Sequence, residues 1–335
     1  MTETDPLSRF RLLANASSKQ WSRHLHPLEA KTGISALALS GGGEDGAFGA
    51  GALAGWTASG NRPEFDMVTG ISTGALIAPF AFLGPAQDDA LRRIFTQYDA
   101  KDIMQLRVFK APLGDAIYDT TPLAGLIKDF TPPVVLRAIA ARHVAGGRLF
   151  VVTSDLDRSR AVVWNMGEIA QSGQYDLFRA LLRASAALPG LFSPVTLTYK
   201  IGDTTYTETH LDGGVHMQFL AIPKFAYTSK HHKLPEGSLY LLINNTLEPA
   251  PTKVSRSALA ISQHALTTSV RANALAEVNA TRLFARANGI DLSVASVDPD
   301  SGVIYDPSDR FSSAYMNALF QNGFARGIGG TLWTS

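Results

Sequence analysis

The order strand, glycine-rich turn, helix occurs twice near the start of the chain, and it constrains the fold more than any other feature. Residues 34–40 form a short apolar run that ends in glycines, and residues 47–58 are small enough to form a helix lying close to a sheet. Residues 66–69 form a second strand-like run, followed by the helix-like residues 75–83. Because parallel strands need a crossover between them, this order predicts a parallel sheet covered by helices.

The rest of the chain continues the α/β pattern. Residues 148–154 and 160–165 are β-rich runs joined by a short turn, as are residues 196–201 and 204–210, so the sequence predicts two hairpins. Residues 255–287 predict one long helix, whose apolar residues we expect in the core rather than facing a membrane. The remaining predicted elements are helices at 88–98, 122–130, 134–143, 175–187 and 308–326, and strands at 238–243 and 292–297.

Composition excludes several classes of protein. The chain has 335 residues, of which 45% are hydrophobic and 18% charged, which is typical of a globular protein with a sizeable core. A net charge of +1 without any basic run argues against a dedicated nucleic-acid binder. The absence of cysteine excludes disulfides, thiol nucleophiles and thiolate metal sites. We expect no metal and no cofactor.

No apolar run approaches the roughly 20 residues that span a bilayer, and the first thirty residues lack the apolar core of a secretory signal. The sequence therefore predicts a soluble or peripheral protein, cytoplasmic by default. Residues 1–33 form an N-terminal extension with apolar residues at helical spacing. This segment is either a helix packed on the domain surface or a helix that lies at a membrane interface.

Residues 70–74 have the pattern GxSxG, with Ser72 between Gly70 and Gly74. A serine at a sharp turn from a strand into a helix is held in a strained backbone conformation, with its hydroxyl exposed above the N-terminus of the helix. The pattern therefore predicts a nucleophile at Ser72. The alternative is an ordinary turn rich in glycine and serine.

The first glycine-rich turn permits two interpretations. Gly41, Gly42, Gly43 and Gly46 fit the pattern GxGxxG of dinucleotide-binding loops, which needs an acidic residue at the end of the second strand. Asp66 has the right spacing but lies at the start of that strand, so this interpretation fails. Consecutive glycines also expose backbone N–H groups that can stabilise the oxyanion of a tetrahedral intermediate. If the two strands are parallel neighbours, this loop and the GxSxG turn meet at one edge of the sheet.

A nucleophilic serine needs a base, and the sequence offers two kinds. In a Ser-His-Asp triad the histidine follows late in the chain, where His264 lies within a helical segment. Asp212 instead ends a predicted strand and is followed by Gly213 and Gly214, so its carboxylate projects from a tight turn with small neighbours. The alternative for this position is a plain Asp-Gly turn.

Taken together, the glycine loop at 41–46, the GxSxG at 70–74 and the Asp-Gly-Gly at 212–214 resemble the patatin-like phospholipases in order and spacing. The resemblance covers about residues 34–225. Supporting matches are YDTTPL at 118–123, VTSDL at 152–156 and RASAALPGLF at 183–192.

The resemblance implies a three-layer α/β/α fold with a mostly parallel central sheet and helices on both faces. It implies a catalytic domain at 34–225, with residues 226–335 continuing the same domain. It further implies a Ser-Asp dyad of Ser72 and Asp212, with an oxyanion hole from the loop Gly41, Gly42 and Gly43. The expected substrate is an acyl lipid or ester, and the expected partner is a membrane surface contacted peripherally. The alternatives are an esterase with a Ser-His-Asp triad and a catalytically silent lipid-binding module of the same fold.

One position departs from the family pattern. Many members carry Arg or Lys just before the last glycine of the oxyanion loop, whereas this chain has Asp45, preceded by Glu44. Carboxylates pointing toward an oxyanion hole would disfavour the anion, so we expect both to face solvent or to favour the helix N-terminus. The departure puts a preference for anionic head groups in question more than it does acyl transfer.

Overall fold

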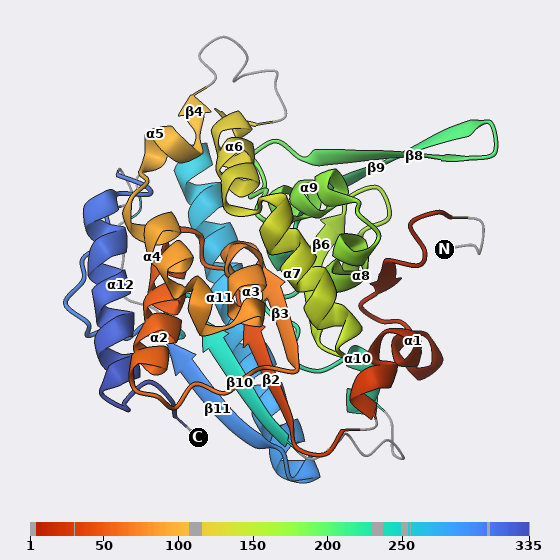
Figure 1. The fold of residues 1–335 in the computed structure, drawn as a ribbon. Coiled ribbons are helices and arrows are strands. Elements are labelled where there is room, and N and C mark those ends of the chain that lie inside the picture. Colours follow the sequence, from red (N-terminus) through yellow and green to blue (C-terminus); the bar gives the residue numbers. More distant parts are fainter. Residues whose placement is uncertain are drawn as a thin grey trace.

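A nine-stranded sheet forms the middle layer of the molecule (Figure 1). The computed structural model describes residues 5–29, 31–106, 116–228, 237–248, 254, 256–306 and 309–334. The strands of this sheet are β1 (Arg11–Leu13), β2 (Ile34–Leu39), β3 (Met67–Ile71), β6 (Arg148–Asp155), β7 (Arg160–Asn165), β8 (Val195–Ile201), β9 (Thr204–Asp212), β10 (Gly237–Ile243) and β11 (Asp291–Ser296). A separate short pair is formed by β4 (Gln105–Leu106) and β5 (Tyr118–Asp119).

The sheet has a parallel centre and an antiparallel side. Strands β6, β3, β2, β10 and β11 lie next to one another in this order and are all parallel. Strands β7 and β9 pair with β6 antiparallel, and β1 and β8 pair antiparallel with β7 and β9. The expected parallel pairing of the first two predicted strands is therefore confirmed, and so are both hairpins.

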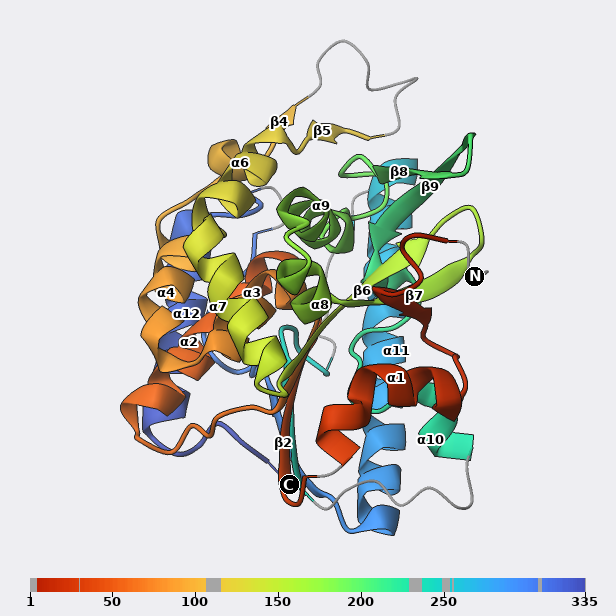
Figure 2. The same cartoon turned by 45° about the vertical axis from the view of Figure 1, so that its right-hand side comes forward.

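Helices cover both faces of the sheet, which the edge-on view in Figure 2 shows plainly. One face is covered by α2 (Gly46–Ala58), α3 (Thr73–Leu83), α4 (Asp88–Thr96), α6 (Thr121–Phe130), α7 (Pro133–Val144), α8 (Met166–Gln171), α9 (Tyr175–Ser185) and α12 (Ser313–Ile328). The other face is covered by α1 (Ser18–Glu29), α10 (Lys224–Thr228) and α11 (Ala258–Asn288). A short helix, α5 (Ala100–Ile103), lies beside β4. The chain thus has the three-layer α/β/α fold that the resemblance implies.

Two strands meet end to end along β6, and this junction positions the site. Strand β3 ends where Ile71 pairs with Val152 of β6. Strand β9 arrives from the opposite direction and ends where Asp212 pairs with Thr153, the next residue of β6. The residue after Ile71 and the last residue of β9 are therefore held close together by their common neighbour.

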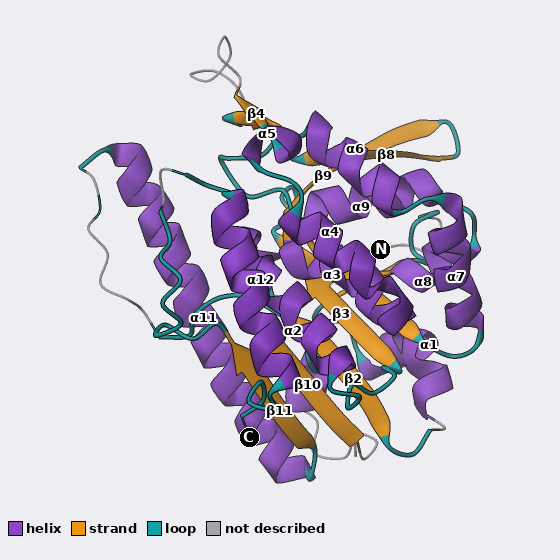
Figure 3. Cartoon of the chain, turned by 60° about the vertical axis from the view of Figure 1, so that its left-hand side comes forward, coloured by secondary structure: helices purple, strands orange, loops and turns teal. Residues whose placement is uncertain are grey.

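Helix α11 differs from expectation in its first half. Ile261 and Leu266 are 54% and 42% exposed, because this part of the helix extends beyond the sheet (Figure 3). The second half packs on the sheet through residues such as Val278, whereas Leu275 and Leu283 on the same half are exposed. The prediction that the apolar residues of this helix belong to the core is therefore wrong for the first half and holds only for the sheet-facing side of the second half. No helix among the described residues is long and apolar enough to cross a membrane.

The closing helix also begins later than its predicted start at residue 308. It starts at Ser313, just after Phe311, whose φ of 55° is incompatible with a right-handed helix. Residues 307 and 308 lie outside the described part of the chain. The late start leaves Arg310 and Phe311 in an irregular segment that reaches the glycine loop.

Candidate active site

Ser72 lies at the junction of β3 and α3 in a strained backbone conformation. Its φ and ψ are 55° and −126°, values that a non-glycine residue adopts at a cost of about 1–3 kcal/mol. The turn is tight because the chain passes close to β2: a side chain at Gly74 would lie 2.5 Å from the carbonyl oxygen of Leu39. A serine held in this way has the geometry expected of a nucleophile elbow.

Ser185 at the end of α9 holds this turn in place. Its hydroxyl accepts a hydrogen bond from the backbone N–H of Ser72 at 3.0 Å and donates one to the carbonyl of Val152 at 2.7 Å. Ser185 is completely buried. The sequence motif RASAALPGLF contains this serine, but sequence reasoning assigned it no role, because nothing in the motif shows where its hydroxyl points.

Asp212 lies beside Ser72, as the end-to-end meeting of β3 and β9 requires. Its Oδ1 accepts a hydrogen bond from the backbone N–H of Gly214 at 2.7 Å. Burial raises the pKa of Asp212 to about 6, and the nearby Ser72 hydroxyl and the Gly214 amide limit the rise. Its other oxygen, Oδ2, is buried and has no protein partner of good hydrogen-bond geometry among the described residues. This carboxylate can therefore accept a proton from a nearby hydroxyl.

The described histidines have other roles. His264 is exposed on α11. His210 and His216 hydrogen-bond to the hydroxyls of Thr153 and Ser154 at 2.9 and 2.8 Å. None of the histidines in the described ranges hydrogen-bonds to Ser72 or Asp212, and His231 and His232 lie outside those ranges.

The glycine loop faces the serine. A side chain at Gly41 would lie 3.1 Å from Cβ of Ser72, so any larger residue at this position would crowd the serine. The Gly41 N–H donates to the carbonyl of Gln218 at 3.3 Å, whereas Gly43 has a φ of 58°, in the region that favours glycine. Asp66 lies far from this loop, at the other end of β2 and β3, where it accepts a hydrogen bond from the backbone N–H of Ser35. Its position agrees with the rejection of a dinucleotide site.

The two carboxylates after the glycines do not face solvent: they lie at the N-terminus of α2, the other position that we expected for them, and are bound by the segment that precedes and opens α12. Arg310 donates to both oxygens of Glu44 at 3.2 and 2.9 Å, and the Tyr315 hydroxyl donates to Asp45 at 2.7 Å. Burial raises the pKa of Asp45 to about 7. The sequence did not predict these partners, because they lie more than 260 positions away along the chain.

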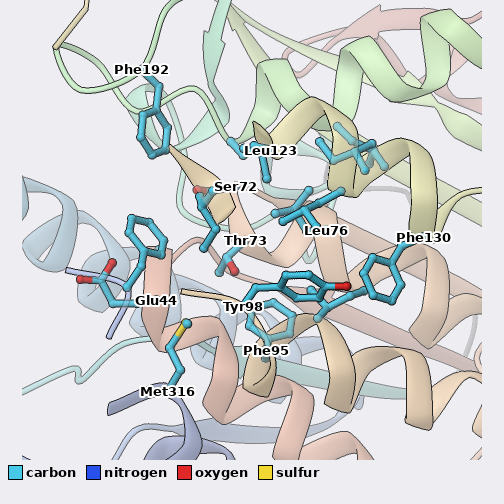
Figure 4. Close-up of a pocket in the computed structure, with 18 of the residues that line it drawn as sticks. Glu44, Ser72, Thr73, Leu76, Phe95, Tyr98, Leu123, Phe130, Phe192 and Met316 are labelled. Carbon is cyan, nitrogen blue, oxygen red and sulfur yellow. The ribbon is translucent and has the colours of Figure 1, made fainter. Parts of the chain in front are cut away.

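An apolar pocket opens beside Ser72 (Figure 4). It has an empty volume of about 850 Å³, including its open mouth, and lies among α3, α4, α6 and α9. Its apolar lining residues include Leu76, Phe80, Phe95, Leu123, Ile127, Phe130, Leu182, Phe192, Phe311 and Met316. A pocket of this kind suits the hydrocarbon part of a ligand.

A second group of ionisable residues lies on β6 and β9, away from the serine turn. Ligand atoms of Asp155, Glu208 and His210 lie within 4.8 Å of one another, as in a metal site. Glu208, however, is ion-paired with both Arg11 and Arg158, so its charge is already balanced by guanidinium groups. This group has the composition of a buried ion-pair network.

The fold and the serine turn together have the arrangement typical of serine hydrolases. The family model described as patatin-like phospholipase matches residues 37–223, more than half of the chain, so the chain belongs to this family. At the level of the family, this makes it a lipid hydrolase of the esterase or lipase type.

Two solved structures match this chain at low identity and low TM-score. VipD from Legionella pneumophila is 11% identical with a TM-score of 0.45, and the match covers 90% of this chain and 67% of that one. The type III effector protein ExoU is 13% identical with a TM-score of 0.26, covering 90% of this chain and 54% of the ExoU chain. This chain thus spans about half the length of ExoU. No match was found among the curated proteins.

Proposed function

We propose that this protein hydrolyses carboxylic ester bonds of acyl lipids, with Ser72 as nucleophile and Asp212 as base. The observation that carries the proposal is the meeting of β3 and β9 on adjacent residues of β6, which brings the serine and the carboxylate together. The family to which the chain belongs supports the class of substrate.

In the first half of the reaction, Oγ of Ser72 attacks the ester carbonyl and passes its proton to the carboxylate of Asp212. The negative charge that develops on the carbonyl oxygen is stabilised by backbone N–H groups of the glycine loop. Since the Gly41 N–H donates to Gln218, we assign this role to Gly42 and Gly43, with Gly41 providing the close approach. The tetrahedral intermediate collapses, the alcohol leaves with the proton from Asp212, and an acyl-enzyme remains.

In the second half, Asp212 accepts a proton from a water molecule that attacks the acyl-enzyme. The ester bond to Ser72 breaks, its oxygen recovers the proton from Asp212, and the carboxylic acid is released. A carboxylate is a weak base in water, but burial raises the pKa of Asp212 to about 6, which makes it a better proton acceptor at neutral pH.

The experiment compares hydrolysis of a short p-nitrophenyl acyl ester by the wild type, Ser72→Ala and Asp212→Asn. We expect both variants to lose at least about 10³-fold in kcat, because the two groups act as a unit. Both should stay folded, since Ser72→Ala removes one hydroxyl and Asp212→Asn removes a buried charge. Circular dichroism and thermal unfolding check this.

His264→Ala is the matched control, and we expect it to keep the wild-type rate because this residue is exposed on α11. Equal rates for wild type and Ser72→Ala would refute the proposal. Loss of activity on replacing a histidine, with Asp212→Asn still active, would favour the triad. Failure of a fluorophosphonate probe to label folded wild type at Ser72 would favour a silent lipid-binding module.

A further inference from the structure

The pocket beside Ser72 extends along two helices that lead away from the serine. On α3, Thr73, Leu76 and Phe80 line it, at the spacing of one helix face. On α6, Leu123, Ile127 and Phe130 line it in the same way. Figure 4 shows Leu123 near Ser72 and Phe130 at the far end, so α6 runs in the direction of the pocket, and it shows Leu76 of α3 between Ser72 and Phe130.

Two aromatic rings close the far end. The ring of Tyr98, which follows α4, meets the ring of Phe130 edge to face, with centroids 5.8 Å apart and planes at 89°. The guanidinium of Arg93 lies over the Phe130 ring, 5.4 Å from its centroid, and this cation–π contact helps to hold the ring in place. Figure 4 shows Tyr98 and Phe130 side by side, away from Ser72.

The wall offers few polar groups to a ligand. Apart from Ser72, its polar and charged side chains are Glu44, Thr73, Tyr98 and Thr131. Glu44 is ion-paired with Arg310, and the Thr131 hydroxyl donates to the carbonyl of Ile127. The occupant that such a wall favours is a hydrocarbon chain.

The two helices give the same length for the pocket. Thr73 to Phe80 and Leu123 to Phe130 are each seven steps along a helix, and at about 1.5 Å per step this is about 10 Å, roughly the length of an eight-carbon chain. We propose that the pocket holds the acyl chain of the substrate and that the Tyr98–Phe130 pair limits this chain to about eight to ten carbons. The proposal rests on the proposed function, because it takes Ser72 as the site of acylation.

The first experiment measures kcat/KM for p-nitrophenyl esters of increasing chain length, from four to sixteen carbons. Each methylene that enters the pocket should raise kcat/KM by up to about three- to fourfold, as expected for burial of a CH₂ group. We expect the increase to stop at about eight to ten carbons and the value to fall for longer chains, which must pass the two rings.

Variants at the closed end and in the middle of the pocket should shift this optimum in opposite directions. Phe130→Ala and Tyr98→Ala remove the closed end, so we expect the optimum to move to twelve or more carbons. Leu76→Trp fills the middle of the pocket, so we expect the optimum to move to six carbons or fewer. Tyr206→Ala, which removes an exposed tyrosine from β9, is the matched control and should keep the wild-type optimum.

The second experiment separates this proposal from the proposed function. Binding of saturated fatty acids to Ser72→Ala, measured by calorimetry, does not depend on hydrolysis. We expect affinity to rise with each carbon up to eight to ten and then stop rising, and Phe130→Ala to extend the rise.

An affinity that rises evenly to sixteen carbons, or an optimum unchanged in both Phe130→Ala and Leu76→Trp, would overturn the chain-length limit. That result would leave the dyad intact. If Ser72→Ala instead hydrolyses esters as fast as the wild type, while fatty-acid affinity still stops rising at eight to ten carbons, the proposed reaction is overturned. The chain-length limit of the pocket then stands. If Phe130→Ala fails to fold, Leu76→Trp and Tyr98→Ala still decide the question.

Discussion

Asp212 is a buried carboxyl group, and its protonation state decides whether it can act as a base. Because its pKa is raised to about 6, the ionised form that accepts a proton predominates only above this pH. We therefore expect kcat/KM for a short acyl ester to rise about tenfold per pH unit below pH 5 and to level off above pH 7. A pH–rate profile between pH 4 and 8 measures this.

A histidine base would give a similar profile, so a second condition is needed. A water-miscible organic cosolvent raises the pKa of a carboxylic acid, because ionisation creates a charge, whereas it leaves or lowers the pKa of a histidine. We expect the acid limb of the profile to move to higher pH in the cosolvent. A limb that stays in place or moves to lower pH would contradict a carboxylate base. Asp45→Asn is the control, because it removes another carboxyl group near the site whose pKa is raised. We expect its pH–rate profile to keep the same acid limb as the wild type.

For individual residues of the site, the sequence predicts the position of some side chains and not of others. The turns around Ser72 and Asp212 have local signatures, because glycines must stand where the chain turns sharply or passes another strand. The structure brings both residues together with the glycine loop. Ser185 and Arg310 have no such signature, because a hydroxyl and a guanidinium acquire their partners only when distant segments pack.

The glycine loop is joined to the segment that precedes α12 by an ion pair between Glu44 and Arg310. The Glu44 side chain is almost completely buried. We expect Arg310→Met to lower kcat by about 10- to 100-fold, because an unpaired buried Glu44 costs several kcal/mol and moves the loop that faces Ser72. Labelling of Ser72 by a fluorophosphonate probe should slow by a similar factor.

The double variant Glu44→Gln/Arg310→Met distinguishes this effect from a general loss of packing. It leaves no unpaired charge, so we expect it to recover most of the activity that Arg310→Met loses. If the double variant loses as much kcat as the two single variants together, the ion pair does not hold the loop in place. Tyr315→Phe, which removes only the hydrogen bond to Asp45, should have the smaller effect.

The sequence predicts helices and strands well where the hydrophobic pattern of neighbouring residues is enough to define them. The strands of both hairpins and the parallel pair β2 and β3 are confirmed, because their alternation or apolar runs are set by neighbouring residues in the chain. Helix α11 was misjudged because its helical period continues past the end of the sheet, and the sequence does not show where the sheet ends. The segment before α12 was misjudged for a related reason, since the positive φ of Phe311 depends on tertiary packing.

For the whole molecule, the N-terminal segment is an integral part of the fold. Strand β1 extends the sheet by pairing with β7, and Arg11 on this strand is buried between Asp5 and Glu208. The pKa of Glu208 is lowered, because hydrogen bonds from His210, Arg11 and Tyr199 outweigh the opposing effect of burial. The stability that this lowered pKa contributes is present above the ordinary pKa of a glutamate and is lost as the pH falls through its value in the folded protein.

Arg11 therefore connects the N-terminal strand to the strand that carries Asp212, and replacing it tests how far the whole molecule depends on that connection. We expect Arg11→Met to lower the free energy of unfolding at pH 7 by about 3–5 kcal/mol, because Glu208 then loses its buried guanidinium partner and keeps the half-exposed Arg158. The matched control is Arg9→Met, which removes a guanidinium that is 61% exposed and should cost less than about 1 kcal/mol.

Urea unfolding of the wild type and both variants measures these differences. At 25 °C the folded fraction of Arg11→Met should keep the wild-type kcat on a short acyl ester, because Arg11 does not line the pocket beside Ser72. Equal losses of stability in the two variants would show that the buried network contributes no more than a surface ion pair. A specific loss of kcat in folded Arg11→Met would instead show that the network positions Asp212 through β9.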